Sequence, residues 1–442
     1  MDMKKRVLAV LLVIALLVVM VAACTETPAP PAPPAGGGTT PPAGGTPPAG
    51  GATTTDRVIR VGFVAPLTGP QARFTHGISA VAERSLRIMN EELGGFYISG
   101  YGYIPIEIIW GDSQSDAIIA AEAADRLVTV ENVDILVGQW TPTHTVPVSV
   151  AADRHQVPAL VVNGPDGGWL GAGPFEWAFA CLFNMETLVR EFYRGWDTLD
   201  TNRRVGIVMD NSSDGVFQSS LLNAIGPEFG FTVIDPGRFP EGTVDFTAVL
   251  TELMNQDVDI VATVNGTPAL VTMWNQMQQL GFQPVSVLMN RGMHFSADVA
   301  LLEGAFTGEG VSWSAQWAAD MPFTSSLSGM TVAELNAAHS ADTGQAADLV
   351  VGWDNMIFDI LHDVFTRVDT LEPEAIRAAL ASTNLMTANG HVQFDSQNLS
   401  LTPSFMGQWV HCDEWGFRGV VASGYYDPYL ICIGLVPMPW SE

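Results

Sequence analysis

The stretch Val58-Ile-Arg-Val-Gly-Phe-Val-Ala-Pro-Leu-Thr-Gly-Pro70 decides how this chain is expected to fold. Its first part, Val58–Ala65, is a short run of mostly apolar residues and predicts a buried β-strand. A turn rich in Pro, Thr and Gly follows, and the amphipathic stretch Phe74–Leu93 predicts a helix. Short Val/Ile-rich strands that alternate with longer helices indicate parallel sheets with helices on both faces.

The same unit recurs along the chain in two series. In the first series, further strands are expected at 104–110, 133–137 and 157–162, and helices at 115–130, 145–155 and 185–197. In the second, strands are expected at 205–209, 231–234, 260–264 and 285–289, and helices at 215–229, 247–255 and 268–280. Later helices are expected at 332–341, 346–368 and 372–381, with short antiparallel strands from Gly390. Two series predict two α/β lobes.

The N-terminus has the pattern of an export signal with a lipid anchor. Three basic residues at positions 4–6 precede an unbroken apolar run, Val7–Ala23, which is long for a signal peptide and marginal for a membrane span. The run ends in Val21-Ala-Ala-Cys24, which resembles a bacterial lipobox. We therefore predict a signal peptide at 1–23 and lipidation of Cys24, with a plain membrane anchor as the alternative.

The segment 24–56 is expected to be a disordered tether. After the cysteine it consists almost wholly of Pro, Ala, Gly and Thr, which cannot bury a hydrophobic core. With either kind of anchor, the chain is expected to work outside the cytoplasm while attached to a membrane.

The charge balance excludes several classes of function. The chain has 19 Lys and Arg residues against 47 Asp and Glu residues, which gives a formal net charge of −28. This balance argues against a nucleic-acid partner, because phosphate binding needs a basic face. Both lysines, Lys4 and Lys5, lie before the predicted cleavage site, so the mature chain offers no lysine for a Schiff base or a phosphate-binding loop.

Enzyme motifs are missing from the sequence. It contains no GxxxxGK[ST], GxSxG, HExxH or CxxC, and the glycines of Gly164–Gly173 do not have GxGxxG spacing before a helix. The histidines show no metal-ligand spacing; His144 and His294 fall on loops after strands, where they could contact a ligand or be solvated. We therefore expect no catalysis, no cofactor and no metal.

The helix expected at 346–368 carries three acidic residues at nearly helical spacing, Asp354, Asp359 and Asp363. A solvated helix face explains this spacing most simply, and a metal or acid–base role is the alternative. The neighbouring Trp353 is expected in the core.

The few cysteines outside the N-terminus do not form a disulfide scaffold. Cys412 and Cys432 could pair across a short C-terminal excursion, which would leave Cys181 as a buried thiol.

The loops that follow the strands are the candidate binding regions, because open parallel sheets bind ligands beyond the carboxyl ends of their strands. These loops are 66–75, 111–115, 138–145, 163–173, 210–215, 265–268 and 290–295. They are rich in Gly, Asn, Thr and Trp, a composition that suits a small polar organic ligand.

Several segments, in this order, carry a resemblance to a known family. They are Val61-Gly-Phe-Val-Ala-Pro-Leu-Thr-Gly-Pro70, Asp112-Ser-Gln-Ser-Asp116, Val137-Gly138 with Thr141, Thr143 and Thr145, then Val205–Gly215, Gly242–Phe246, Val258–Gly281 and Gly390-His-Val-Gln-Phe-Asp395. From Val58 to about Val436 the chain resembles the type I periplasmic solute-binding proteins. It most resembles the leucine/isoleucine/valine-binding proteins of branched-chain amino acid ABC transporters.

The resemblance implies an α/β fold of two Rossmann-like lobes whose parallel sheets are joined by three crossovers. Lobe one would comprise 57–180 plus 311–390, and lobe two 181–310 plus 391–442. We expect a monomeric extracytoplasmic lipoprotein that captures an amino acid, amide or carboxylate in the interlobe cleft and delivers it to an ABC transporter permease. A ligand-sensing receptor component of the same fold, without transport, is the alternative.

The resemblance also places the ligand-binding residues. In lobe one they are Phe74, as the family's aromatic contact, Trp140, Thr141 and Thr143, around the family's hydroxyl loop, and Asn163 and Asp166, in the loop that holds the ligand's carboxylate and ammonium. Pro142 stands where the family has its ligand-binding serine. In lobe two, Asp214 and Gly266 take the places of two tyrosines.

Arg291 falls where the amino-acid binders have a glutamate for the ammonium group. A guanidinium suits a carboxylate instead, which favours a ligand with an acidic group and a flat or apolar body. Two alternatives stay open: Arg291 could pair with Asp214, or the alignment could shift by a residue or two. Asp166 or Asp214 could still hold a cationic end. Trp313 and Trp317 could line the cleft rim or pack in the core.

Overall fold

The computed structural model describes residues 57–424 and 432–440. The predicted signal peptide (1–23), the lipidated Cys24 and the tether (24–56) all lie outside these residues. Within the described part of the chain, no helix combines the length and the apolar character that crossing a membrane would require.

The first sheet has six strands in the order β16-β7-β6-β5-β1-β4, and neighbouring strands pair in parallel throughout. The strands are β1 (Ile59–Ala65), β4 (Ile106–Asp112), β5 (Ile135–Gln139), β6 (Ala159–Pro165), β7 (Ala178–Phe183) and β16 (Leu399–Leu401). Side chains alternate between the two faces of the sheet, so that Leu136 joins one core cluster while Ile135 and Val137 join the other. The sheet is therefore buried on both sides, as its continuous apolar strands predict.

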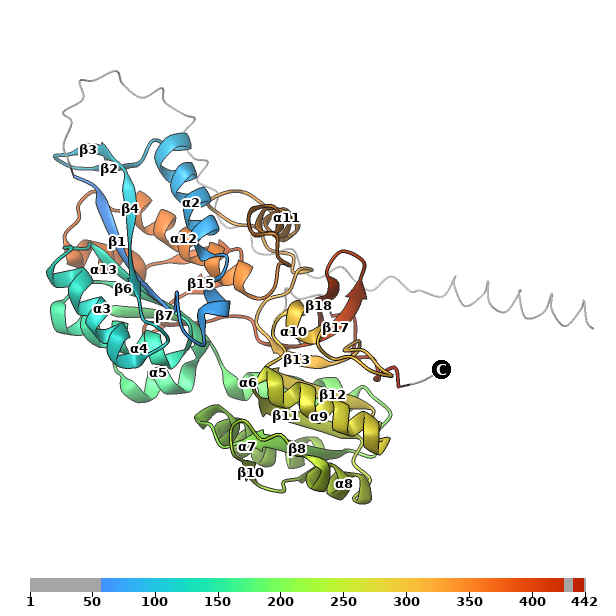
Figure 1. Cartoon of the computed structure of the whole chain (residues 1–442). Coiled ribbons are helices and arrows are strands. Elements are labelled where there is room, and N and C mark those ends of the chain that lie inside the picture. The colour runs from blue at the N-terminus through green and yellow to red at the C-terminus, as the bar shows by residue number, and fades with distance from the viewer. Residues whose placement is uncertain (1–56, 425–431, 441–442) are drawn as a thin grey trace, which may run out of the picture. The chain divides into compact units, whose positions relative to one another are not determined.

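Helices cover both faces of this sheet (Figure 1). The helices α3 (Ala117–Thr129) and α4 (Thr141–His155) pack on one face, and α2 (Ile78–Arg87) and α12 (Val350–Arg367) on the other. The shorter elements around them are η1 (Ala72–Thr75), η2 (Ile88–Glu92), α5 (Asp166–Ala172), α11 (Val332–Thr343) and α13 (Pro373–Ala381), with the hairpins β2 (Phe96–Ile98)–β3 (Gly102–Ile104) and β14 (Asn384–Thr387)–β15 (Gly390–Gln393).

The second sheet has eight strands in the order β10-β8-β11-β12-β13-β17-β18, with β9 also paired to β8. They are β8 (Arg204–Asp210), β9 (Thr232–Ile234), β10 (Arg238–Phe239), β11 (Ile260–Asn265), β12 (Ser286–Arg291), β13 (Ser312–Ala315), β17 (Phe405–Cys412) and β18 (Gly416–Ser423). All pair in parallel except β17 and β18, which extend the edge antiparallel. The helices of this part are α6 (Met185–Asp197), α7 (Ser213–Ile225), η3 (Gly226–Phe229), α8 (Thr247–Asn255), α9 (Thr267–Leu280) and α10 (Ser296–Val299).

The chain passes between the two sheets three times: after β7, between β13 and α11, and between β16 and β17. We call the part built on the first sheet lobe one and the part built on the second sheet lobe two. The strand pairings correct the expected boundaries, because β13 lies beyond residue 311 but in the second sheet, and β16 lies beyond residue 391 but in the first. Both strands are short and pair with distant segments, so their sequences alone did not indicate their sheet.

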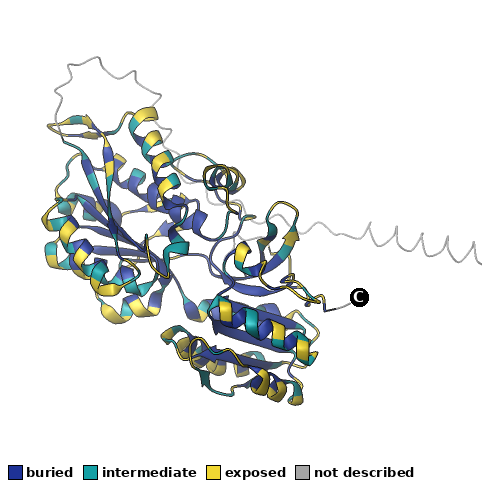
Figure 2. Cartoon of the chain, viewed as in Figure 1, coloured by how far each residue is buried: buried dark blue, intermediate teal, exposed yellow. Residues whose placement is uncertain are grey.

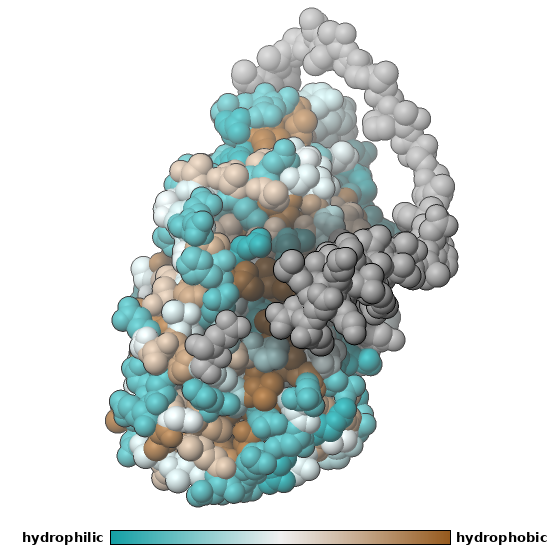
Figure 3. Space-filling model, turned by 90° about the vertical axis from the view of Figure 1, so that its right-hand side faces the viewer, coloured by the Kyte–Doolittle hydropathy of each residue, from teal (hydrophilic) through white to brown (hydrophobic). Residues whose placement is uncertain are grey.

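Most strand residues and the sheet-facing sides of the helices are buried (Figure 2). The face shown in Figure 3 is largely hydrophilic or mixed, with hydrophobic residues gathered near its middle. Several elements were not predicted, and two of them lie in lobe one near the proposed binding side. The strand β7, with the sequence AFACLF, is wholly buried, and α5 forms inside the glycine-rich stretch that was expected to be a loop.

The acidic residues of α12 contradict the expected solvated face. Asp354 and Asp359 are fully buried, and only Asp363 lies toward solvent. Asp359 accepts hydrogen bonds from the backbone N–H groups of Leu327 (2.9 Å) and Ala388 (2.9 Å), which compensate the cost of burying a carboxylate. Burial raises the pKa of Asp359 to about 6.

The cysteine pairing that the sequence left open is not formed. Cys412 ends β17 as a free thiol, so no disulfide joins it to Cys432. Cys181 lies fully buried in β7, as expected, and burial raises the pKa of its thiol.

Candidate functional site

Four predicted site residues occupy unusual backbone conformations at the carboxyl ends of parallel strands. Trp140 (φ 68°) and Thr141 (φ 57°) follow β5, Asn163 (φ 61°) lies near the end of β6, and Arg291 (φ 66°) ends β12. Side-chain-bearing residues rarely adopt positive φ, and such strain is concentrated at sites whose geometry is held by the surrounding fold. The residues with positive φ therefore lie at the carboxyl ends of the strands. This is the side on which open parallel sheets bind their ligands.

Aromatic contacts connect the two lobes at this level. The ring of Phe74 packs against Trp140 in its own lobe, with centroids 4.8 Å apart, and against Phe295 of lobe two at 5.3 Å. Phe74 is partly buried and Trp140 almost fully buried. Two predicted residues are thus brought together, and a third aromatic ring that the sequence did not single out completes the group.

Arg73, which the sequence reasoning also missed, holds the lobes together beside these rings. Its guanidinium lies 4.5 Å from the centroid of Phe295, forms an ion pair with Asp298 and donates to Thr267 Oγ1 (3.2 Å). All three partners belong to lobe two. A second contact joins the lobes where Asp348 accepts hydrogen bonds from the backbone N–H (3.1 Å) and hydroxyl (3.3 Å) of Ser296. The described structure therefore has the lobes in direct contact.

Arg291 pairs with a different carboxylate from the one considered in the sequence. It forms an ion pair with Asp210 and donates to Ser212 Oγ (2.9 Å), so the pairing with Asp214 that the sequence left open is not the one formed. Asp214 instead accepts from Gln218 Nε2 (3.0 Å), and burial raises the pKa of Asp214. Because Asp210 already neutralises it, Arg291 offers an incoming anion less attraction than an unpaired guanidinium would.

Buried polar atoms without hydrogen-bond partners gather at the ends of β5 and β6. In the described part of the chain they include Trp140 Nε1, Asn163 Nδ2 and His144 Nε2, with Gln139 Oε1 and Asp354 Oδ2 behind them. A buried donor or acceptor that stays unsatisfied costs about 1–3 kcal/mol, so native proteins rarely keep several together. These atoms are able to form further hydrogen bonds at the carboxyl ends of the two strands.

Behind that cluster lies a buried carboxyl–amide pair. Gln139 Nε2, at the end of β5, donates to Asp354 Oδ1 of α12 (2.5 Å). Burial raises the pKa of Asp354 to about 8, so this carboxyl group is mostly protonated at neutral pH.

The remaining predicted residues described next lie on α4, on α5 and at the start of α9, and they do not form one compact group. Thr141 donates to Gln71 Oε1 (3.4 Å), and Thr143 is partly buried in the first turn of α4. Asp166 begins α5 and accepts from Asn184 Nδ2 (2.7 Å). Gly266 caps α9, and a side chain added there would meet almost nothing.

Of the two histidines at the strand ends, His144 is fully buried and His294 partly buried. The Nδ1 atom of His144 bonds the carbonyl of Trp140. His294 Nε2 contacts Ser314 Oγ (3.1 Å), and burial together with Arg73 lowers the pKa of His294 to about 3. Both rings are uncharged at neutral pH, since burial also lowers the pKa of His144.

Comparison with known proteins shows the family. The chain matches the periplasmic binding protein family over residues 58–410 and belongs to it. The fold is the type I fold of the Leu/Ile/Val-binding proteins, with mixed α/β lobes and parallel sheets. This family is a class of extracytoplasmic solute-binding proteins rather than of enzymes.

Individual relatives are distant. "Leu/Ile/Val-binding protein homolog 8" of Brucella abortus is 20% identical over 310 residues, which is 66% of this chain and 74% of the relative. The closed leucine-, isoleucine-, valine-, threonine- and alanine-binding protein of Brucella ovis superposes with a TM-score of 0.68 at 17% identity, covering 84% of this chain and 97% of that one. An R. palustris solute-binding protein in complex with 4-hydroxybenzoate has a TM-score of 0.65 at 14% identity, covering 82% and 95%.

Proposed function

We propose that this chain is an extracytoplasmic lipoprotein, attached through Cys24, that captures a small polar organic solute between its lobes and delivers it to an ABC importer. The observation that carries the proposal is the cluster of buried, unpartnered polar atoms at the ends of β5 and β6, beside the aromatic contacts that join the lobes. The solute class is an amino acid, amide or carboxylate.

The proposed roles follow from the chemistry of each side chain. Trp140 Nε1 and Asn163 Nδ2 donate to the solute's oxygen atoms, and Phe74 packs on its apolar part. Thr141 and Thr143 supply hydroxyl groups at the start of α4.

On the side of lobe two, the proposed contacts with the solute are mainly polar. In this proposal Asp214 receives a cationic end of the solute, and Gly266, where an added side chain would meet almost nothing, leaves room above α9. A solute carboxylate would share the guanidinium of Arg291 with Asp210, which favours a solute that also carries a cationic group over a simple anion. In lobe one, Asp166 lies at the start of α5 and could orient that group through Asn184.

Entry of the solute requires the lobes to separate. The contacts of Arg73 with Asp298 and of Asp348 with Ser296 would break in the open form and re-form around the solute. Hinge motion of this kind is the usual way in which two-lobed proteins enclose a ligand.

A thermal-shift screen of the full chain in detergent tests the binding proposal. The panel sets branched-chain and aromatic amino acids against aliphatic and aromatic carboxylates, amides and urea. A solute at about 100 times its Kd adds about 2.7 kcal/mol to the stability of the folded state, which raises Tm measurably. A panel that leaves Tm unchanged throughout would refute the proposed class of solute.

Anchoring and transport need their own tests. Cys24→Ser should release the protein from the membrane fraction and abolish labelling by radioactive palmitate. Cells that lack this protein should lose uptake of the identified solute, and the loss should be reproduced by deleting the partner permease. Uptake that persists in both strains would favour the sensing role over transport.

A further inference from the structure

The hairpin β2–β3 carries most of the exposed aromatic side chains in the described part of the chain. In residues 57–424 and 432–440, four side chains of Tyr, Phe or Trp are exposed, and three of them lie on this hairpin. They are Tyr97, Tyr101 and Tyr103, which are 55%, 42% and 66% exposed. The fourth is Phe217 of α7, in lobe two. Aromatic side chains gathered on one exposed element are typical of a surface that contacts a partner.

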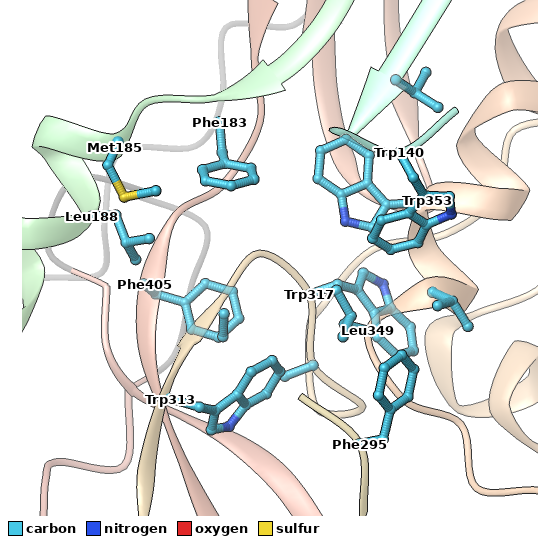
Figure 4. Packing of buried hydrophobic residues seen from close by; sticks show 14 of the residues in the cluster. Trp140, Phe183, Met185, Leu188, Phe295, Trp313, Trp317, Leu349, Trp353 and Phe405 are labelled. Carbon is cyan, nitrogen blue, oxygen red and sulfur yellow. The ribbon is translucent and has the colours of Figure 1, made fainter. Parts of the chain in front are cut away.

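The large aromatic side chains elsewhere are mostly enclosed. Trp313 and Trp317, for which the sequence left the cleft rim and the core as alternatives, are almost fully buried and belong to the core. Figure 4 shows them among other buried rings, including Phe295. Exposure of aromatic rings is therefore a property of the hairpin and not a general feature of the described chain.

The alternation of side chains along the hairpin directs the tyrosines outward. Phe96 and Ile98 are buried on the inner face, and the ring of Phe96 lies 5.8 Å from that of Phe365 of α12. Tyr97 and Tyr103 are opposite each other in the two strands, with ring centroids 5.7 Å apart. Because the inner face is packed on lobe one, the outer face is held toward solvent.

The hairpin is also free of charge. Residues 93–106 contain no Asp, Glu, Lys, Arg or His, although the whole chain has a formal net charge of −28. The acidic residues that flank this stretch, Glu92 and Glu107, form ion pairs with Arg87 and Arg60. An uncharged aromatic projection can approach a bilayer without the repulsion that anionic lipids exert on an acidic surface.

The hairpin lies where the described chain begins. Strand β3 leads into β4 through Pro105, whose carbonyl accepts a hydrogen bond from the N–H of Ile59 at the start of β1 (2.9 Å). Figure 1 shows β2 and β3 at this end of lobe one. The sequence that precedes residue 57 leads back to Cys24, the predicted lipid anchor. A random-coil linker of the length of 24–56 spans about 30 Å on average, so an anchored chain keeps this end of lobe one near the bilayer.

These features favour a lipid surface as the partner. Tyrosine combines an apolar ring with a hydroxyl group and is enriched at the level of the lipid headgroups. A short linker to the anchor gives an effective concentration in the millimolar range, so even a small contact is occupied. A stable protein interface takes about 20 to 30 residues from each partner, and the stretch 93–106 is shorter than that.

We propose that the tyrosine hairpin, residues 93–106, docks into the headgroup region of the bilayer to which the chain is attached. This inference rests on the proposed function, because attachment through the N-terminus brings the hairpin to the membrane. Strand β1 runs for seven residues, about 20 Å, from this end of lobe one to the binding side. Docking therefore turns the carboxyl ends of the strands away from the bilayer, toward incoming solute, and delivery to a permease requires the hairpin to be released.

Hydroxyl-radical footprinting of the full chain, purified from membranes and reconstituted in phosphatidylcholine vesicles, tests the docking. Mass spectrometry measures the oxidation of Tyr97 and Tyr103 relative to that of Phe217, the exposed ring of lobe two. The variant Ser99→Glu places a carboxylate at the exposed turn of the hairpin and keeps all three tyrosines, so it should undock the hairpin. We expect the relative oxidation to be at least about threefold lower in the wild type than in Ser99→Glu, because headgroups shield docked rings.

A matched control and a second measurement assign the effect to the hairpin. Thr251→Glu adds the same charge at an exposed position of α8 in lobe two and should leave the oxidation ratio at its wild-type value. Neutron reflectometry of the full chain on a supported phosphatidylcholine bilayer measures the gap between protein and headgroups. The wild type should contact the headgroups, and the combined variant Tyr97→Ser, Tyr101→Ser and Tyr103→Ser should leave a hydrated gap.

Several results would overturn the inference. Equal relative oxidation in the wild type and Ser99→Glu is one, and an equal gap beneath the wild type and the combined variant is another. Protection of the tyrosines in native membrane vesicles but not in pure lipid would mean that the hairpin contacts a membrane protein instead. If the chain floats with the vesicles while the hairpin stays accessible, this inference fails and the proposed attachment stands. If the chain does not float with the vesicles, both fail.

Discussion

Replacing Asp354 by asparagine should make the stability of this protein much less sensitive to alkaline pH. The carboxyl group is fully buried, its Oδ1 accepts from Gln139 Nε2, and its Oδ2 has no partner in the described structure. An asparagine would keep the accepted bond and could donate its own N–H to Gln139 Oε1, which is also unpartnered.

The magnitude follows from the shift in pKa. Burial raises the pKa of Asp354 to about 8, from an ordinary value of 3.8. The folded state therefore holds a proton that the unfolded state releases, so stability falls as pH rises from about 4 to about 8 and then levels off. Between pH 5 and pH 9 this one group should remove about 4 kcal/mol from the free energy of unfolding, and Asp354→Asn should abolish that loss.

Urea unfolding of wild type and variant at pH 5, 7 and 9 measures the effect. The difference between the two proteins isolates residue 354, because every other titrating group is shared. The control Asp363→Asn lies on the same helix but toward solvent, where its ion pair with Arg367 contributes at most about 1 kcal/mol. Parallel pH profiles for wild type and Asp354→Asn would refute the reasoning.

Other predictions concern the lobes, the packing and the thiols. Arg73→Ala should weaken the contact between the lobes by about 1–2 kcal/mol and increase the radius of gyration in small-angle X-ray scattering; an unchanged radius would contradict it. Gly352→Ala should lower stability by about 1–3 kcal/mol through overpacking, whereas Gly171→Ala, which meets no atom within 4 Å, should not; equal Tm values would disprove this account. Iodoacetamide should modify Cys412 but not the buried Cys181 in the native protein, as peptide mass spectrometry would show.

The parts of the fold that depend on local sequence could be predicted. Strand β1 and helix α8 lie within a residue of their expected positions, because apolar runs and helical periodicity are read within a short window. Strand β7 was missed although its continuous apolar run is a strand signal. Strands β13 and β16 were assigned to the wrong lobes, because the partner of a short strand is set by contacts far away in the chain.

The candidate site, like the fold, could be predicted only in part. Strand order indicated the loops beyond the strand ends as the expected binding side, and the structure places Phe74 and Trp140 in contact there. The partner of Arg291 could not be read from the sequence, since Asp210 and Asp214 lie in one short segment and only the backbone decides which carboxylate is reached. The burial of Asp354 could not be predicted for a similar reason, because this residue of α12 has its partner, Gln139, in a strand far away in the sequence.

The crossing of the chain between the sheets also sets the order in which the protein can complete its fold. Strand β7 is paired on one side by β6 and on the other by β16, which comes more than two hundred residues later. Until Leu399–Leu401 has been synthesised, β7 presents an open edge to which another chain could attach. The nascent lobe one therefore depends on residues near the end of the chain, and a protein truncated before β16 should be prone to association through that edge.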